Sequence, residues 1–201
     1  MKCADLITVI FNKEKQNPML KNKTKKPTWT DLKKEIIKLN HSQMISLIKD
    51  LYRLSKSNRD FLHVRFSIGK DRIDPYKKII EDAMYPDIYK DKPISISRAK
   101  QAISDYSKAT DDPLGKIDLM IFLVEWGNHY TLNYGDIDAN FYNSLISMYE
   151  KAVKEVISLP DQEQEEFRER LKEIMESTSD IGWGYYDGIF AAYYKAFDDE
   201  D

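Results

Sequence analysis

Apolar side chains recur along most of the chain at intervals of three and four residues, which places them on one face of an α-helix. The clearest stripe lies between residues 42 and 55 and consists of Met44, Leu47, Ile48, Leu51 and Tyr52. No stretch alternates apolar and polar residues over the length of a strand. The pattern predicts an all-α fold, and we expect the stripe in residues 42–55 to face a hydrophobic core.

A second segment differs because residues 114–134 are apolar almost all round. A helix without a polar face is typical of the centre of a domain, and Gly135 marks its end. The other helices are expected to begin near Thr30, Ser57 or Asn58, Asp74, Ser97, Asp138, Pro160 and Gly182. We therefore expect a single compact domain of about eight or nine mostly antiparallel helices. No repeat of solenoid length is evident, although paired helices are compatible with a short helical array.

The first residues follow no helical or strand period. Residues 12–27 are polar and rich in lysine, with Pro18 and Pro27 among them. Such a composition is typical of a flexible arm, so we expect an arm over residues 1–27 and a helical domain over residues 28–201 that ends in a short acidic tail. Met19 offers an alternative start for the natural chain.

The composition is that of a globular protein, with 42% hydrophobic and 32% charged residues. Its charge is divided unevenly, because residues 1–60 hold 14 Lys and Arg against 6 Asp and Glu. They carry +8 and the remainder carries −11 of the net −3. The arm could neutralise nucleic-acid phosphates through Lys21, Lys23, Lys25 and Lys26. The acidic remainder would repel a polyanion, so a solvated arm is the favoured interpretation.

Neither a secretory signal nor a segment long enough to cross a membrane is evident, and no membrane-surface role is expected. The single cysteine, Cys3, excludes a disulfide within the chain and any multi-cysteine zinc site. A lone thiol fits a reducing compartment, so we expect a cytoplasmic protein.

Two stretches carry a family resemblance: LYRLSKSNRDFLHVRF from Leu51 and YKKIIEDAMYPDIYKDKPISISRAKQAI from Tyr76. With YGDIDANFYNSLISMYEKA from Tyr134, they resemble an uncharacterised, all-helical bacterial family of unknown function. The resemblance runs from about Leu32 to Phe197. It implies helices but no catalytic or ligand-binding residue, so no role is carried over.

Familiar catalytic motifs are missing from the sequence: there is no Gly-x-Ser-x-Gly elbow, no P-loop and no Gly-x-Gly-x-x-Gly. Glu125 and His129 are four residues apart and share one face of the central helix, a geometry that suits acid–base chemistry or metal binding. A di-metal helical site would need Glu-x-x-His pairs on two helices, and that spacing does not occur in the sequence. An ion pair or hydrogen bond is the favoured interpretation, and we expect no metal and no cofactor.

Aromatic residues are the most unusual feature. Trp126, Tyr130 and Tyr134 lie on the central helix, and Trp183 and Tyr185 lie near the C-terminus. Large rings with one polar atom are enriched at binding hot spots and in ligand pockets, although most aromatic residues at helical spacing belong to a core. These five residues are the candidate binding positions.

Three functions remain open. The favoured one is a non-enzymatic helical protein-interaction or regulatory module, because an aromatic-rich body lacks a catalytic constellation. The second is association with nucleic acid through the arm. The third is an enzyme or small-ligand binder with a pocket formed by Glu125, His129 and neighbouring tyrosines.

Overall fold

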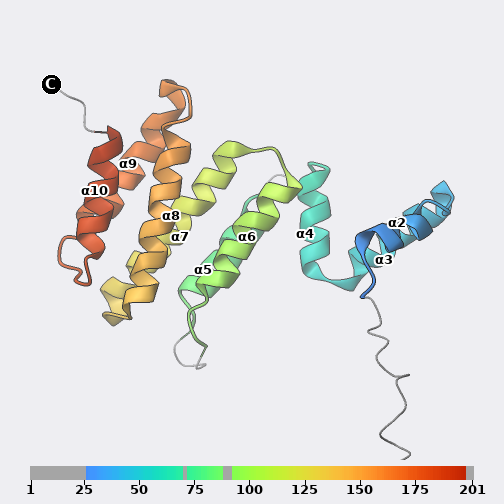
Figure 1. Ribbon diagram of the computed structural model, residues 1–201, viewed down its shortest axis with the longest axis horizontal. Helices are drawn as coiled ribbons and strands as arrows, with labels where there is room; N and C mark the ends of the chain where they lie inside the picture. The colour runs from blue at the N-terminus through green and yellow to red at the C-terminus, as the bar shows by residue number, and fades with distance from the viewer. Residues whose placement is uncertain (1–25, 70–71, 88–91, 198–201) are drawn as a thin grey trace, which may run out of the picture. The chain divides into compact units, whose positions relative to one another are not determined.

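The computed structural model describes residues 26–69, 72–87 and 92–197, and all regular elements in these ranges are α-helices (Figure 1). The nine helices within them are α2 (Trp29–Ile36), α3 (His41–Leu54), α4 (Lys56–Arg65), α5 (Asp74–Met84), α6 (Ile96–Ala109), α7 (Pro113–Tyr134), α8 (Ala139–Val156), α9 (Asp161–Ser177) and α10 (Tyr185–Phe197). The predicted all-α fold of eight or nine helices is confirmed.

The chain divides into two units, residues 1–50 and residues 51–201. This division lies inside the domain that we expected over residues 28–201. The expected arm lies almost entirely outside the described residues, so these domain limits stay predictions. In the first unit α2 begins at a capping box, in which Thr28 accepts a hydrogen bond from the Asp31 N–H and donates its own N–H to the Asp31 carboxylate. The cap is therefore Thr28 and not Thr30.

The helix predicted over residues 42–55 is present as α3, but its apolar stripe does not face a core. No residue of α3 is buried, and Met44, Ile48 and Leu51 are 39%, 43% and 45% exposed. Helical spacing shows only that one face could be covered, because spacing carries no information about a neighbour. The prediction of a core-facing stripe is wrong.

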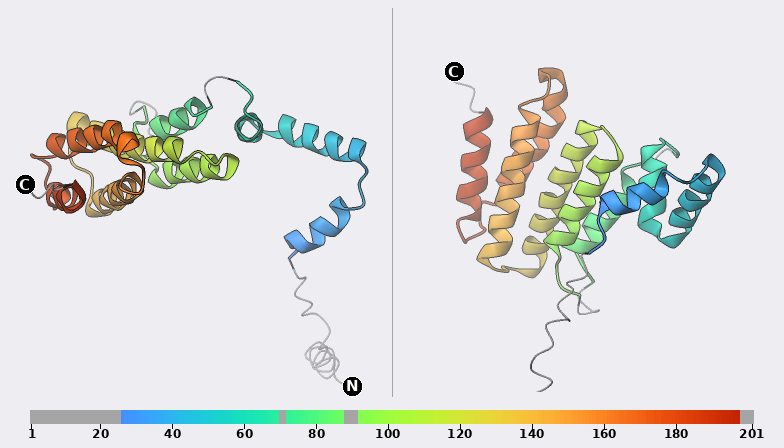
Figure 2. Two further views of the ribbon diagram at one scale, coloured as in Figure 1. Left: turned by 90° about the horizontal axis from the view of Figure 1, so that it is seen from above. Right: turned by 45° about the vertical axis from the view of Figure 1, so that its right-hand side comes forward.

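Residues 51–201 form a stack of helix pairs. Successive helices pack on one another as α5 with α6, α7 with α8 and α9 with α10, and α4 packs against α6. The pairs join because α7 packs against both α5 and α9, while α8 packs against α10. The helices α5, α7 and α9 thus follow one another in one layer, with α6, α8 and α10 beside them (Figures 1 and 2).

The helix α7 is the centre of this stack, as its apolar sequence predicts. It packs against α5, α6, α8 and α9. Ile117, Leu119, Ile121 and Leu123 are all completely buried, although they point to different sides of the helix. A helix surrounded by others on most sides needs apolar residues on most sides, and the sequence supplies them.

Two close contacts fix the position of α7 in the stack. A Cβ at Gly127 would lie 2.7 Å from the Leu145 side chain, so only glycine lets α8 approach this closely. One residue further on, the buried Asn128 amide donates to Ser177 at 3.1 Å and accepts from the Tyr185 hydroxyl. This hydrogen-bonded chain links α7 to the end of α9 and the start of α10.

Helix ends were predicted with mixed success. Asp112 and Asp138 cap α7 and α8 through their side chains, and Gly135, with φ of +92°, ends α7. Three starts differ from expectation: Ser55 caps α4, Ser95 caps α6, and α5 has Asp74 inside its first turn with no side-chain cap. Several neighbouring polar residues can each serve as a cap, so sequence alone leaves the start uncertain by a few residues.

Within the described ranges, no helix combines the length and apolar character that crossing a membrane requires.

Candidate functional site

Aromatic side chains form one continuous group along the layer of α5, α7 and α9. Five positions of α7 with helical spacing supply most of it, and Tyr85, the residue at which α5 ends, joins them. We call the group the aromatic cluster, and its members are Tyr85, Phe122, Trp126, His129, Tyr130 and Tyr134.

Tyr85 lies at the middle of the aromatic cluster. Its ring centroid is 4.9 Å from that of His129, 5.3 Å from that of Trp126 and 5.4 Å from that of Tyr134. These tilted arrangements are favourable for aromatic pairs. The cluster is therefore held by two helices and does not depend on the orientation of one side chain.

The outer end of the cluster is accessible. Tyr134 is 45% exposed, and its hydroxyl accepts a hydrogen bond from the Tyr85 hydroxyl at 3.2 Å. The hydrogen bond with Tyr85 raises the pKa of Tyr134, and partial desolvation adds to the effect. The cluster thus presents large apolar faces together with the neutral Tyr134 hydroxyl at neutral pH.

Four charged residues form a network next to the aromatic cluster. The Arg170 guanidinium on α9 makes two hydrogen bonds to Glu125, at 2.8 and 2.9 Å, and a third to Asp118 at 2.8 Å. Lys77 on α5 approaches the other Asp118 oxygen at 2.7 Å. This charged network, Lys77, Asp118, Glu125 and Arg170, joins α5, α7 and α9.

Burial and partners act in opposite directions on Arg170. Desolvation is the largest single influence and lowers its pKa, but the hydrogen bonds and charges of Glu125 and Asp118 together outweigh it and raise the pKa. The guanidinium is a permanent cation at any ordinary pH. A bidentate pair of this kind fixes the orientation of both side chains, so Glu125 is held in place.

A cavity of about 710 Å³ lies over the charged network, and we call it the α5–α9 groove. A smaller hollow of about 310 Å³, lined by Phe122, Glu125, Trp126 and His129, adjoins it through two shared residues, Phe122 and Glu125. Glu163 and Glu166 also line the groove and take part in no ion pair with a described residue. The groove is consequently acidic, with an aromatic wall at one end.

The structure brings together some of the candidate binding residues and separates others. Trp126, Tyr130 and Tyr134 belong to the aromatic cluster. Trp183 is 58% exposed and donates its ring N–H to Asp136 at 3.3 Å. Tyr185 is completely buried and bonded to Asn128, so it can contact no partner directly.

Glu125 and His129 share a hollow but do not bond to each other. Glu125 is committed to Arg170, while His129 packs against Tyr85 and Trp126. In the described part of the chain, no three His, Cys, Asp or Glu side chains gather as a metal site would require. Glu125 thus forms its ion pair with Arg170, a residue that the sequence analysis did not name.

Sequence reasoning missed Tyr85 and three members of the charged network, Lys77, Asp118 and Arg170. Arg170 had a usable signal, because it lies on the inner side of the very acidic segment DQEQEEFRERLKE of α9. Tyr85 had none, since its place in the cluster depends on how α5 ends beside α7. Of the arm lysines, Lys21, Lys23 and Lys25 lie outside the described residues, and Lys26 is exposed.

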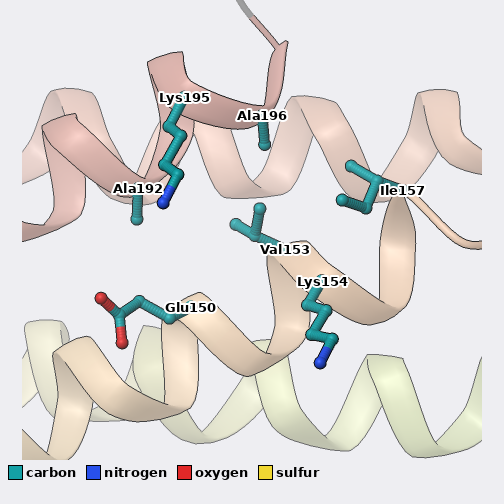
Figure 3. A pocket seen from close by; sticks show the side chains of 7 residues that line it. All are labelled: Glu150, Val153, Lys154, Ile157, Ala192, Lys195 and Ala196. Atoms are coloured by element: carbon teal, nitrogen blue, oxygen red, sulfur yellow. The ribbon is translucent and has the colours of Figure 1, made fainter.

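Another hollow, of about 300 Å³, lies between α8 and α10 (Figure 3). Val153 and the alanines Ala192 and Ala196 form its apolar surface, and its charged groups are the ends of long exposed side chains such as Lys154 and Lys195. Such side chains are free to move, so this hollow offers no fixed polar arrangement.

The fold and site define an all-helical protein built as a stack of helix pairs with an aromatic and acidic face. A family model matches residues 28–198, and its description is a family of unknown function (DUF6155). The chain belongs to this family, which confirms the resemblance to an uncharacterised family; the match begins at Thr28, the cap of α2. Neither the curated proteins nor the solved structures give a match.

Proposed function

We propose that this protein is a non-enzymatic interaction module that binds a basic segment of a partner protein along the α5–α9 groove. The observation that supports this most strongly is the continuity of the aromatic cluster with an acidic groove on a rigid layer of helices. Interfaces derive most of their affinity from a few aromatic and arginine anchors in such preformed places.

The charge of the groove indicates the chemistry of the partner. Arg170 and Lys77 are already neutralised by Glu125 and Asp118. Glu163 and Glu166 keep carboxylates without a cationic partner in the described residues. A lysine or arginine of the partner would neutralise them, while an apolar or aromatic side chain beside it would contact Trp126.

The origin and the cellular compartment of the protein are proposed from the sequence alone. We propose a bacterial, cytoplasmic protein, supported by the bacterial family that the sequence resembles and by a lone cysteine that fits a reducing compartment. Association with nucleic acid through the lysine-rich arm is the second candidate, supported by the +8 charge of residues 1–60.

A capture experiment with surface variants tests the proposal. Tagged full-length protein is incubated with native lysate, half of which is treated with nuclease, and the recovered proteins and nucleic acids are identified. We expect one stoichiometric protein that survives nuclease and that is lost from the double variant Trp126→Ala, Tyr134→Ala. A photo-crosslinking aromatic residue in place of Tyr134 should then join that protein covalently.

Leu132→Ala is the matched control. Leu132 is 58% exposed on the same helix, but two residues correspond to about 200° around a helix, so it points away from Tyr134. Equal recovery by the double variant and the control would contradict the proposal. Recovery that is nuclease-sensitive and requires residues 1–27 would favour nucleic acid. Turnover or a bound metal that is lost in Glu125→Ala or His129→Ala would favour an enzyme.

A further inference from the structure

A separate cavity, of about 570 Å³, opens between α4, α5 and α6. We call it the α4–α6 cavity, and it shares no lining residue with the α5–α9 groove. Phe61, Ile79 and Ala102 give it apolar walls, and charged groups of both signs lie among them. A partly apolar hollow with a few convergent polar groups is the usual form of a small-molecule site.

Tyr76 supplies an unused polar group in this cavity. The residue is only 4% exposed, and its ring packs edge-on against Tyr106 at 5.3 Å. Its hydroxyl forms no hydrogen bond with any described residue. All fully buried side-chain nitrogen and oxygen atoms in the described structure do have partners, so this hydroxyl is not fully buried, and Tyr76 lines the cavity.

Burial and the charges of Asp60 and Asp105 raise the pKa of Tyr76 to about 12. The hydroxyl is therefore neutral at physiological pH and able both to accept and to donate. Asp60 and Asp105 line the same cavity as Tyr76.

Each carboxylate has one oxygen without a partner among the described residues. Lys56 bonds to Oδ2 of Asp60, which leaves Oδ1. Gln101 and Lys108 both bond to Oδ1 of Asp105, which leaves Oδ2. The Asp60 side chain is also only 15% exposed, so its free oxygen is sheltered from bulk water.

The cavity has a cationic end and an anionic end. Arg65 at the end of α4 donates to the Lys108 carbonyl at the end of α6, so the two helices run in parallel (Figure 1). Arg98 therefore lies toward the helix starts, and Asp60 and Asp105 lie further along, while the Lys56 ammonium reaches Asp60 at 2.7 Å and belongs to the same end as Asp60. At 1.5 Å per residue, Arg98 and Asp105 are about 10 Å apart along the axis of α6.

We propose that the α4–α6 cavity binds a small linear zwitterion, whose ammonium group is held by Asp60, Asp105 and the Tyr76 hydroxyl and whose carboxylate is held by Arg98. An ammonium group has three N–H donors, and these three residues offer three acceptors. Arg98 has no ion-pair partner among the described residues, and its planar guanidinium matches a carboxylate with two hydrogen bonds.

The spacing of the two ends defines the ligand further. A spacing of about 10 Å between Arg98 and Asp105 along α6 is too long for an α-amino acid, but extended chain covers about 3.5 Å per residue. Di- and tripeptides with free termini have the required separation, as do ω-amino acids with chains of similar length. The shared chemistry is a linear zwitterion, and the two sources can be distinguished by experiment.

Calorimetric titration of the full-length protein provides the test. The probes are trialanine, N-acetyl-trialanine, trialanine amide, 6-aminohexanoic acid and alanine. We expect saturable binding of trialanine, at least about tenfold weaker binding when either terminus is blocked, and no measurable binding of alanine. Tighter binding of 6-aminohexanoic acid would identify the ω-amino acid as the source, and tighter binding of trialanine would identify the peptide.

Variants assign the binding to the cavity. Asp60→Asn and Arg98→Gln should each weaken binding of trialanine by at least about tenfold, and Tyr76→Phe by about threefold to tenfold with the ring packing preserved. Asp82→Asn is the matched control, because Asp82 is an exposed α5 carboxylate outside the cavity and should leave binding unchanged. Thermal melts of each variant verify that it is folded.

The proposal is overturned if trialanine and 6-aminohexanoic acid both fail to saturate up to about 10 mM. Equal binding of blocked and free peptides would also overturn it, as would wild-type affinity in folded Asp60→Asn and Arg98→Gln. None of these variants lies in the aromatic cluster or the α5–α9 groove, so this outcome leaves the proposed interaction surface unaffected.

Discussion

A single buried hydrogen bond ties the last helix to the centre of the stack. The Tyr185 hydroxyl donates to Asn128, whose amide in turn reaches Ser177, so three helices depend on one polar chain. Burial raises the pKa of Tyr185 well above its ordinary value, which keeps the hydroxyl protonated as a donor. In a dry environment, such a chain is stabilising only while each member has its partner.

Tyr185→Phe should lower the free energy of unfolding by about 1–3 kcal/mol, because it leaves a buried amide oxygen of Asn128 without a donor. Urea denaturation followed by circular dichroism measures the change. Tyr186→Phe is the matched control, since the adjacent half-buried Tyr186 contacts the Phe190 ring, makes no hydrogen bond with a described residue and should be nearly neutral. An equal loss of unfolding free energy in both variants would show that the hydrogen bond between Tyr185 and Asn128 does not contribute measurably to stability.

At the scale of one helix, the central position of α7 was predicted correctly because its sequence is apolar on almost all sides. A helix that is apolar on all sides is shielded from water only at the centre of a domain, and α7 is buried there. The stripe of α3 is a contrasting case, since amphipathic spacing alone does not supply the surface that would cover it.

In the candidate site, too, the positions within one helix could be predicted from sequence, and the contacts between helices could not. Helical spacing alone placed Trp126, Tyr130 and Tyr134 on neighbouring positions of one helix. Tyr85, Lys77 and Arg170 come from other helices, and their contribution depends on packing between elements far apart in sequence. Tyr185 resembles a surface aromatic in sequence because its polar partner, Asn128, is 57 residues away.

The contact between α7 and α8 gives a prediction with an unusual sign. Glycine to alanine in an open helix usually stabilises it, by up to about 1 kcal/mol. At Gly127 the new Cβ would lie 2.7 Å from Leu145, so Gly127→Ala should destabilise the protein by about 1–3 kcal/mol. Differential scanning calorimetry measures the shift in Tm.

Two further variants separate crowding from other causes. Gly182→Ala has no atom within 4 Å of the added Cβ and should leave Tm nearly unchanged. Adding Leu145→Ala to Gly127→Ala should produce less than the sum of the single losses, because the smaller side chain relieves the clash. Additive losses would mean that Leu145 is not the cause.

On the scale of the whole molecule, the buried residues in the described ranges all lie in one unit. The first of them in the chain is Val64, and none belongs to α2 or α3. A fragment of residues 51–201 should therefore unfold cooperatively, with a free energy of unfolding within about 1 kcal/mol of the full chain. Parallel chemical denaturation of both proteins checks this, and loss of cooperativity in the fragment would contradict it.

Buried tyrosines give the whole molecule a dependence on alkaline pH. Burial is the main reason that the pKa values of Tyr106, Tyr149 and Tyr185 are raised, and it raises that of Tyr76 to about 12. Above the ordinary value near 10, the unfolded chain loses these protons while the folded one retains them. Stability is therefore full below about pH 10 and falls as the pH rises toward 12 and beyond.

Absorbance of tyrosinate against pH measures this directly. Only part of the thirteen tyrosines should ionise near pH 10, and the remainder should ionise together when circular dichroism reports unfolding. Tyr149→Phe, which removes one buried proton-binding group, should make the loss of stability with pH less steep. Simple titration of all tyrosines near pH 10 without unfolding would contradict the prediction.

The order of the helix pairs also determines which part of the stack can unfold locally. Each pair is held only by its neighbours, so the last pair, α9 and α10, has a neighbour on one side alone. When that pair detaches, Arg170 leaves Glu125 and Asp118 behind, and the groove loses one of its walls at the same moment. Separation of this pair would thus remove the proposed recognition face while the rest of the stack stays folded.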